Sequence, residues 1–337
     1  MKIYKHNLKD AKPFFTKDTS IIRSILDQTN APVKNESLAE AVLRKSKSTI
    51  EHVHGKSEEI YYFTKGTGVM YLNDKKIKVK TGDGVLISPG VRHRLVNTGA
   101  HEIKILCLCA PPYSHEDTLT TKRNLKMVIF DFDGTLVDSA PGIWKTANEM
   151  AKLYGVKPIT MKQVTTSVGT GLDNFIEDLF PEQLKKYSME AMIKTYRKIY
   201  SHSFAFGLKV FRNVVAVLKY MEKRKIKAAI VSNKLKKYVD EINKYIGINK
   251  YFDITLGSES VKKMKPHPEA VFYIMKKYGL NKEDVLLVGD SQYDIETAKN
   301  AGVTSAFITQ GYADLKKVMK LSPDFCFNDI GKLREIL

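Results

Sequence analysis

Cysteine is scarce in this chain of 337 residues, which has only three: Cys107, Cys109 and Cys326. Their spacing fits no metal finger, and Cys107 and Cys109, two apart in an apolar stretch, are expected to face the core as small apolar residues. Long apolar runs are also missing, so no stretch approaches the length that spans a bilayer, and the first residues lack the apolar segment of a signal peptide. We therefore predict a cytoplasmic protein without a membrane partner.

Acidic residues are fewer than basic ones, 37 against 55, which gives a net charge of +18. A basic chain can bind nucleic acid, but these lysines are spread over several predicted helices, without an arginine-aromatic stripe or a known binding motif. We therefore predict no nucleic-acid partner. A basic surface would instead attract small phosphorylated substrates.

The two halves of the chain have different patterns. Residues from about 38 to 110 are predicted as short β-strands, because apolar and polar side chains alternate between turn residues. After residue 126, apolar strands alternate with helical patterns, which predicts a parallel, doubly wound α/β sheet. The segment 142–206 is helical almost throughout and too long for a simple crossover, so it is predicted to be an α-helical cap insertion that closes over a site.

The pattern changes in a polar stretch led by two prolines. Since the length favours about two domains, we place an all-β domain at 1–115, a linker at 116–125 and the α/β domain at 126–337. The first domain includes a short N-terminal extension, in which residues 20–26 have a helical pattern and are expected to brace the barrel or an oligomer interface.

Two carboxylates follow the first strand of the α/β half. Side chains alternate along a strand, so Asp131 and Asp133 point the same way, and Gly134 and Thr135 then turn the backbone around them. This arrangement suits phosphoryl transfer. One carboxylate can attack phosphorus while its neighbour gives a proton to the leaving oxygen, and a divalent cation offsets the crowded negative charge.

Three later segments of this half also end in residues suited to phosphate chemistry: Ser232 with Asn233, Lys265, and Asp290 with Asp294. Reacting groups collect at the carboxyl ends of parallel strands, so these residues are expected to meet the paired carboxylates. Ser232 can donate to a phosphate oxygen, and Lys265 can neutralise the transferring group. Asp290 can complete a Mg²⁺ shell with Asp131, and Asp294 can hold a metal-bound water or orient Lys265.

In these motifs, residues 126–337 resemble the haloacid dehalogenase superfamily of phosphohydrolases, in the helical-cap branch that includes phosphoglycolate phosphatase. The resemblance implies that Asp131 forms an aspartyl-phosphate and that Asp133 acts as general acid and then general base. It also implies that Mg²⁺ is held by Asp131, the Asp133 carbonyl and Asp290, near Asp294. Relatives that cleave carbon–halogen or phosphonate bonds lack the second aspartate, so Asp133 indicates hydrolysis of phosphate esters or anhydrides.

Further residues are expected to contact the substrate. Gly134, Thr135 and Asn233 flank the reacting groups, and the resemblance places Thr170 and Gly171 in a loop of the cap that selects the substrate. The amides at the start of the next helix could contact an anion. A simple turn between two helices is the alternative for this loop.

The β half holds a second constellation. His52 and His54 alternate onto one face of a strand, Glu59 opens the next strand, and His93 comes from a separate turn, so all four could converge inside a small barrel. Three imidazoles and one carboxylate suit a divalent transition metal such as Fe, Mn, Ni or Zn.

These four residues, with Gly66, Gly82, Pro89 and Gly90 around them, resemble the two signatures of cupin barrels over residues 38–115. The N-terminal domain is then a cupin barrel. The chain departs from the signatures at Ser46, where glycine is usual, and at Ser88, where proline is usual. Neither position is a metal ligand, and a metal-free barrel with histidines on its wall is the alternative.

Together these patterns predict a Mg²⁺-dependent phosphatase of a small phosphorylated metabolite, of the phosphoglycolate or sugar-phosphate type. The cupin is expected to bind a ligand or to regulate, and a homodimer through it is one prospect. Alternatives are a phosphomutase, and a bifunctional enzyme whose cupin isomerises a sugar phosphate. A non-enzymatic sensor is least supported, because all the catalytic positions are intact.

Overall fold

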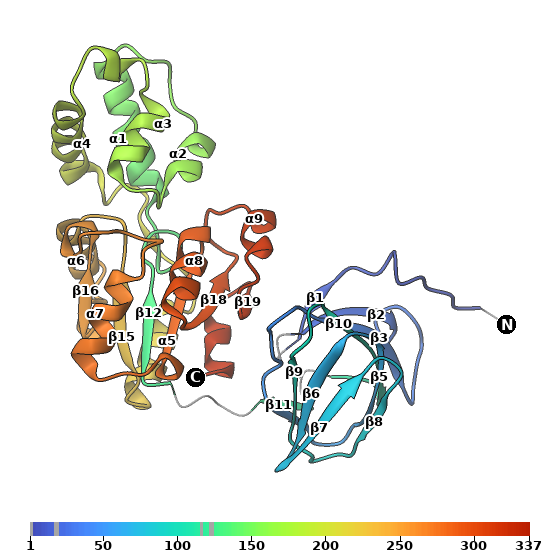
Figure 1. Ribbon diagram of the computed structural model, residues 1–337. Helices are drawn as coiled ribbons and strands as arrows, with labels where there is room; N and C mark the ends of the chain where they lie inside the picture. The colour runs from blue at the N-terminus through green and yellow to red at the C-terminus, as the bar shows by residue number, and fades with distance from the viewer. Residues whose placement is uncertain (1–2, 17–19, 115–116, 121–124) are drawn as a thin grey trace. The chain divides into compact units, whose positions relative to one another are not determined.

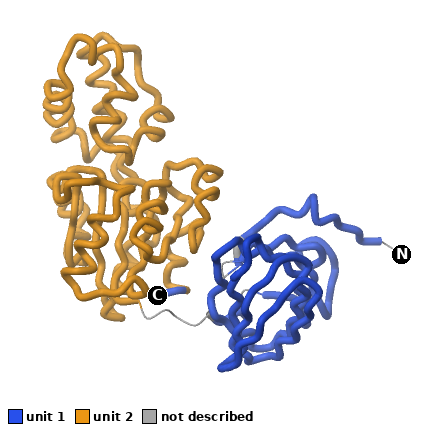
Figure 2. Tube along the Cα trace, in the orientation of Figure 1, with its two compact units in different colours: residues 1–123, 336 blue, residues 124–335, 337 orange. Residues whose placement is uncertain are grey.

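The computed structural model describes residues 3–16, 20–114, 117–120 and 125–337 (Figure 1). The chain divides into two compact units, residues 1–123 with 336 and residues 124–335 with 337 (Figure 2). Among the described residues, no helix combines the length and hydropathy that crossing a bilayer requires.

The first unit is built from antiparallel strands in two sheets, with the orders β1-β2-β3-β10-β5-β8 and β11-β4-β9-β6-β7. Alternate side chains of β5 and β10 are buried, so the apolar residues Phe63, Ile105 and Met70 meet between the sheets. Its strands are β1 (Phe14–Phe15), β2 (Ile21–Leu26), β3 (Ser37–Leu43), β4 (His52–His54), β5 (Glu58–Lys65), β6 (Thr67–Leu72), β7 (Lys75–Lys80), β8 (Gly84–Ile87), β9 (His93–Asn97), β10 (Ile103–Ala110) and β11 (Thr118–Thr120). The cupin-like all-β fold predicted for this half is confirmed.

Two predictions about the edges of this unit need correction. The prediction of a helix at 20–26 is wrong, because Ile21–Leu26 form strand β2 and pair antiparallel with β3. Three β-branched isoleucines favour a strand, and the neighbouring strand supplies the hydrogen bonds. The linker predicted at 116–125 is too long at its start, because Thr118–Thr120 form β11 and pair with β4. Residues 116 and 121–124 of that linker lie outside the described residues.

The second unit contains the predicted parallel sheet, with the order β16-β15-β12-β17-β18-β19. The central strand β12 (Met127–Phe130) has four fully buried side chains, as expected for a strand covered on both faces. The other elements of this layer are β15 (Lys227–Val231), β16 (Ile254–Leu256), β17 (Val285–Gly289), β18 (Thr304–Ile308), β19 (Phe325–Phe327), α5 (Val214–Lys223), α6 (Lys236–Tyr245), α7 (Glu269–Tyr278), α8 (Gln292–Ala301), α9 (Leu315–Lys320), η2 (Asn249–Tyr251), η3 (Ser258–Ser260), η4 (Lys282–Asp284) and η5 (Ile330–Glu335).

A helical bundle lies beyond one end of this sheet (Figure 1). It consists of α1 (Ala140–Leu153), α2 (Met161–Ser167), α3 (Leu172–Leu179), η1 (Gln183–Lys185) and α4 (Met189–Ser203). The bundle has its own apolar core, which includes Met150, Phe180 and Tyr200. A two-stranded ribbon of β13 (Val137–Asp138) and β14 (Lys209–Val210) joins the bundle to the sheet layer. The bundle therefore occupies the segment in which the sequence predicts a cap.

Candidate active site and metal centre

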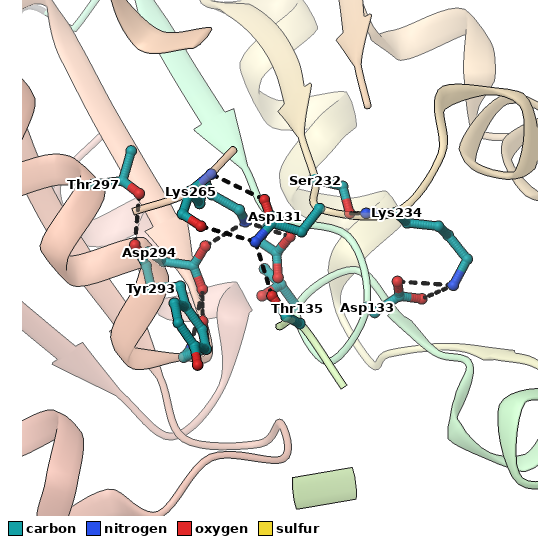
Figure 3. Close-up of polar contacts among 12 residues, drawn as sticks. Asp131, Asp133, Thr135, Ser232, Lys234, Lys265, Tyr293, Asp294 and Thr297 are labelled. Atoms are coloured by element: carbon teal, nitrogen blue, oxygen red, sulfur yellow. Dashed lines mark hydrogen bonds and ion pairs between the residues drawn. The ribbon is translucent and has the colours of Figure 1, made fainter. Parts of the chain in front are cut away.

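Asp131 follows β12 and forms a buried charge group with Lys265 and Asp294. The Lys265 Nζ donates to Asp131 Oδ1 at 2.7 Å and to Asp294 Oδ1 at 2.6 Å (Figure 3). Burial lowers the pKa of Lys265, but the two carboxylates outweigh burial and raise that pKa above its ordinary value. Lys265 therefore stays cationic and holds Asp131 in place. Burial, followed by the charge of Asp294, raises the pKa of Asp131 to about 7.

Asp290 is fixed beside this group by the residues around it. Thr135 Oγ1 donates to Asp290 Oδ1 at 3.0 Å, and the backbone N–H of Tyr312 donates to Oδ2 at 2.8 Å. Gly134 has φ +86°, and a Cβ there would lie 2.3 Å from Asp290 Oδ2, so only glycine fits. Gly134 and Thr135 thus support a carboxylate here, and their predicted contact with substrate stays a prediction.

Three carboxylates offer a cation site. Asp131, Asp290 and Asp294 are buried, and one oxygen from each lies within 4.8 Å of the others. Burial raises the pKa of Asp290 well above its ordinary range, and the charges of Asp131 and Asp294 add to the rise. Lys265 alone offsets only part of this negative charge. Oxygen ligands and an excess of negative charge fit Mg²⁺.

Asp133 lies apart from those three carboxylates, in a different set of contacts (Figure 3). Lys234 Nζ donates to its Oδ1 and Oδ2 at 3.0 and 2.9 Å, and Ser139 Oγ donates to Oδ1 in a short hydrogen bond. Neither partner was singled out from the sequence. Lys234 directly follows Ser232 and Asn233, two predicted site residues, and Ser139 is the N-cap of α1, the first helix after the paired carboxylates. These positions in the sequence could have indicated both residues.

Ser232 and Asn233 follow β15 and differ in what they contact. Ser232 Oγ accepts the backbone N–H of Lys234 at 3.2 Å, and its own O–H can be donated to a phosphate. The amide of Asn233 donates to the Gly169 carbonyl at 2.9 Å and to the Lys265 carbonyl at 3.1 Å, and it accepts the Lys265 N–H at 3.0 Å. Asn233 therefore ties a loop of the bundle to the Lys265 segment.

A cavity of about 310 Å³ lies between the bundle and the carboxyl ends of the strands. Asp131, Asp133, Ser232, Asn233 and Lys265 line it, and so does Gly171. Thr170 is not among the residues that line this cavity. Its Oγ1 donates instead to the Ser167 carbonyl at 2.9 Å, within the loop. The geometry brings the predicted catalytic residues to one cavity, and Thr170 serves the shape of the loop.

The first unit holds a separate cluster of buried metal-binding side chains. His52, His54, Glu59 and His93 come from β4, β5 and β9, and one ligand atom from each lies within 4.8 Å of the others. His52 and His93 face each other in the register of β4 and β9, and the centres of their rings lie 4.0 Å apart. All four residues meet as the sequence predicts.

Backbone carbonyls set the proton positions on two of these imidazoles. His52 Nδ1 lies 2.8 Å from the Ile50 carbonyl, and His93 Nδ1 lies 3.0 Å from the Val91 carbonyl. Each Nδ1 therefore carries the proton, and each Nε2 offers a lone pair. His93 Nε2 and Glu59 Oε2 are buried 3.4 Å apart and make no hydrogen bond to any described residue. Such facing lone pairs fit a bound metal cation.

The fold and the first site define an enzyme with a parallel α/β sheet and a site suited to phosphoryl transfer, in a chain that also carries a cupin-type barrel. A model of the family "Haloacid dehalogenase-like hydrolase" matches residues 128–308, and a "Cupin domain" model matches residues 40–109. The chain belongs to the haloacid dehalogenase-like hydrolases and carries a cupin domain. The prediction that it is an enzyme of the phosphatase type is confirmed.

Similar proteins include a phosphoglycolate phosphatase of Vibrio parahaemolyticus, 30% identical over 223 residues that cover 64% of this chain and 98% of that protein. An uncharacterised protein of Methanocaldococcus jannaschii is 46% identical over 118 residues, which cover 35% of this chain and 94% of that protein. Among solved structures, a predicted phosphoglycolate phosphatase of Haemophilus somnus is 28% identical, with a TM-score of 0.60 over 63% of this chain and 98% of that one.

Proposed function

We propose that the second unit is a Mg²⁺-dependent phosphatase that works through an aspartyl-phosphate on Asp131. The observation that carries this proposal is the separation of the two carboxylates. Lys265 orients Asp131, while Asp133 has its own partners, Lys234 and Ser139. One carboxylate is thus placed for attack and the other for proton transfer.

The chemistry follows from these positions. Asp131 attacks phosphorus, the bond from phosphorus to the ester oxygen breaks, and Asp133 gives that oxygen a proton. Asp133 then takes a proton from water, which attacks the phosphoaspartate and releases phosphate, so that both carboxylates return to their first state. Lys265 and Ser232 offset the charge on the phosphoryl oxygens. Asp131, Asp290 and the Asp133 carbonyl would hold Mg²⁺, with Asp294 nearby, and the ion would supply further positive charge to the phosphoryl group.

The substrate class follows from the cavity and the relatives. A volume of about 310 Å³ suits a small metabolite. Several curated relatives are phosphoglycolate phosphatases. We therefore propose a small phosphate ester, of the phosphoglycolate or sugar-phosphate type.

The test is the substitution Asp131→Asn, which keeps the size of the side chain and removes the nucleophile. We expect the Mg²⁺-dependent release of phosphate from an aryl phosphate to fall by about 10³-fold or more. Asp240→Asn, at a half-buried pair with Lys236 outside the cavity lining, is the matched control and should leave the rate unchanged. Persistent activity in the Asp131 variant would overturn the mechanism.

For the first unit we propose a bound divalent transition metal (Fe, Mn, Ni or Zn) in a ligand-binding or regulatory role. The facing lone pairs of His93 and Glu59 support it. Metal analysis of the purified protein should find about one such metal per chain, because the cluster offers one set of ligands. His93→Gln should lose that metal, while His101→Gln, at an exposed histidine, should keep it. Equal metal content in the two variants would contradict the site.

A further inference from the structure

Tyr312 lies in the loop after β18 and contacts the start of α1, which is distant in the sequence. Its hydroxyl donates to Asp138 Oδ1 at 2.8 Å and accepts the backbone N–H groups of Ser139 and Ala140 at 3.0 and 3.1 Å. A phenol has one proton to donate and lone pairs for two donors, so these three hydrogen bonds use its whole capacity. The proposed chemistry gives this tyrosine no part, so its contacts need a reason of their own.

The start of α1 depends on an acceptor from outside the helix. A serine at an N-cap usually turns its hydroxyl to the first turn of its own helix, but Ser139 makes no such hydrogen bond. Its Oγ donates to Asp133 Oδ1 instead. Ser139 and Ala140 are buried, so their N–H groups would be costly to leave unpaired. The Tyr312 hydroxyl thus anchors the start of α1, while Ser139 Oγ is left to hold Asp133.

The backbone of Tyr312 is fixed beside the clustered carboxylates. Its N–H donates to Asp290 Oδ2 at 2.8 Å. The loop comes so close there that a Cβ on Gly311, the preceding residue, would lie 2.1 Å from the same oxygen. Tyr312 therefore reaches from a carboxylate of the sheet layer to the first residues of the bundle. Because its backbone end is held, its hydroxyl end can fix the position of α1.

We propose that Tyr312 is a positioning residue that sets Asp133 for proton transfer. Its hydroxyl fixes the backbone of Ser139, and Ser139 Oγ in turn holds Asp133 Oδ1. The proposal rests on the phosphatase function and adds a residue that acts on the proton transfer alone. Without the hydroxyl, the start of α1 shifts and the serine no longer holds the carboxylate at the ester oxygen. Lys234 keeps its contacts with Asp133, so the loss is partial.

The experiment compares two esters whose leaving oxygens differ in their need for a proton. Phosphoglycolate releases an alkoxide oxygen, which needs a proton, whereas p-nitrophenyl phosphate releases a stable phenolate, which needs none. Tyr312→Phe keeps the ring and the backbone N–H. We expect its kcat/KM to fall about tenfold with phosphoglycolate and less than about twofold with p-nitrophenyl phosphate. The ratio kcat/KM is the measure because it covers the steps up to release of the leaving group.

A double variant tests the path through Ser139. Ser139→Ala should show the same difference between the two esters, and adding Tyr312→Phe should cost less than about twofold more, because both changes act on one contact. The Mg²⁺ concentration for half-maximal rate should change by less than about twofold, since the N–H that donates to Asp290 remains. Equal losses with both esters, or additive losses in the double variant, would overturn the positioning of Asp133.

Hydrogen exchange gives a readout that needs no turnover. The Ser139 and Ala140 amides should exchange about tenfold faster in ligand-free Tyr312→Phe, because they lose their acceptor. Tyr154→Phe is the matched control, since it removes a half-buried hydroxyl that donates to Thr195 Oγ1 at 3.0 Å within the bundle. It should change neither this exchange nor the difference between the esters.

The two proposals fail in different ways. Unchanged amide exchange in Tyr312→Phe would overturn the role of this tyrosine, even in a protein that releases phosphate. If the wild type cleaves neither ester while the variant exchanges faster, the phosphatase function is wrong and the anchor at the start of α1 stands.

Discussion

Single residues show where this chain departs from the pattern it resembles. Ser46 stands where cupin signatures usually have glycine, and its φ is +60°, in the left-handed region. A residue with a Cβ is strained there by about 1–2 kcal/mol, a strain that glycine avoids. The chain thus has a serine at a backbone position whose φ suits glycine.

We expect Ser46→Gly to stabilise the first unit. The relief of strain exceeds the added entropy of the unfolded chain, so the free energy of unfolding should rise by about 0.5–1 kcal/mol. Urea unfolding followed by circular dichroism measures the change. Ser48→Gly, two residues on and without a positive φ, is the control and should not stabilise. A Ser46 variant that is less stable than the parent would show that the serine side chain makes up for its strain.

The residues that meet at the active site were predictable where they follow strands, and less so elsewhere. Asp131, Lys265 and Asp290 were found because the carboxyl ends of parallel strands share one edge of the sheet. Tyr200 and Ser139 lie on the bundle or at its start, and their distance from Asp133 depends on how the bundle packs. No local pattern carries that information.

At the scale of elements, one side chain joins the bundle to the sheet layer. The Asn233 amide connects the Gly169 carbonyl, in the loop between α2 and α3, with both backbone groups of Lys265. The loop that lines the cavity and the segment that presents the Lys265 ammonium are thus held by the same three hydrogen bonds. We infer that Asn233 positions both, through the backbone.

We expect Asn233→Ala to lower kcat/KM roughly ten- to hundredfold, because each lost hydrogen bond is worth about 1 kcal/mol and the freed groups are partly buried. Steady-state kinetics with an aryl phosphate measures this. Asn174→Ala is the control, since its exposed amide holds the Thr170 carbonyl without reaching the sheet layer. A similar loss in both variants would mean that loop order alone, and not the bridge to Lys265, sets the rate.

Element types were predictable where the period was clear and uncertain at the edges. The helices of the second unit follow the helical spacing of their apolar residues. The strands of its sheet follow short continuous apolar runs, as in β17, where five buried residues stand in a row. The sequence predicts a helix at Ile21–Leu26, where the structure has a strand, because a short run of mixed polarity fits both periods. Its pairing with β3, the next strand along the chain, decides the outcome, and that contact lies outside the segment itself.

At the scale of the whole molecule, the net charge of +18 should speed the encounter with phosphorylated substrates. We expect kcat/KM for a dianionic phosphate ester to fall several-fold when ionic strength rises from about 20 to 200 mM, since salt screens the positive field. The kcat at saturating substrate should change little. Repeating the titration with chloride and with acetate separates screening from competition by one anion, and a kcat/KM that does not depend on either salt would contradict steering.

The short strand β11 has a consequence for any attempt to study the first unit alone. It pairs with β4, in a register that sets Thr118 opposite His54 and Thr120 opposite His52, and Asp117 just before it accepts the backbone N–H groups of Lys56 and Ser57. A polypeptide cut at residue 115 would leave the histidine strand as an open sheet edge, which invites pairing with other chains and aggregation. An isolated barrel has to extend past Thr120 to keep its metal-ligand strand covered.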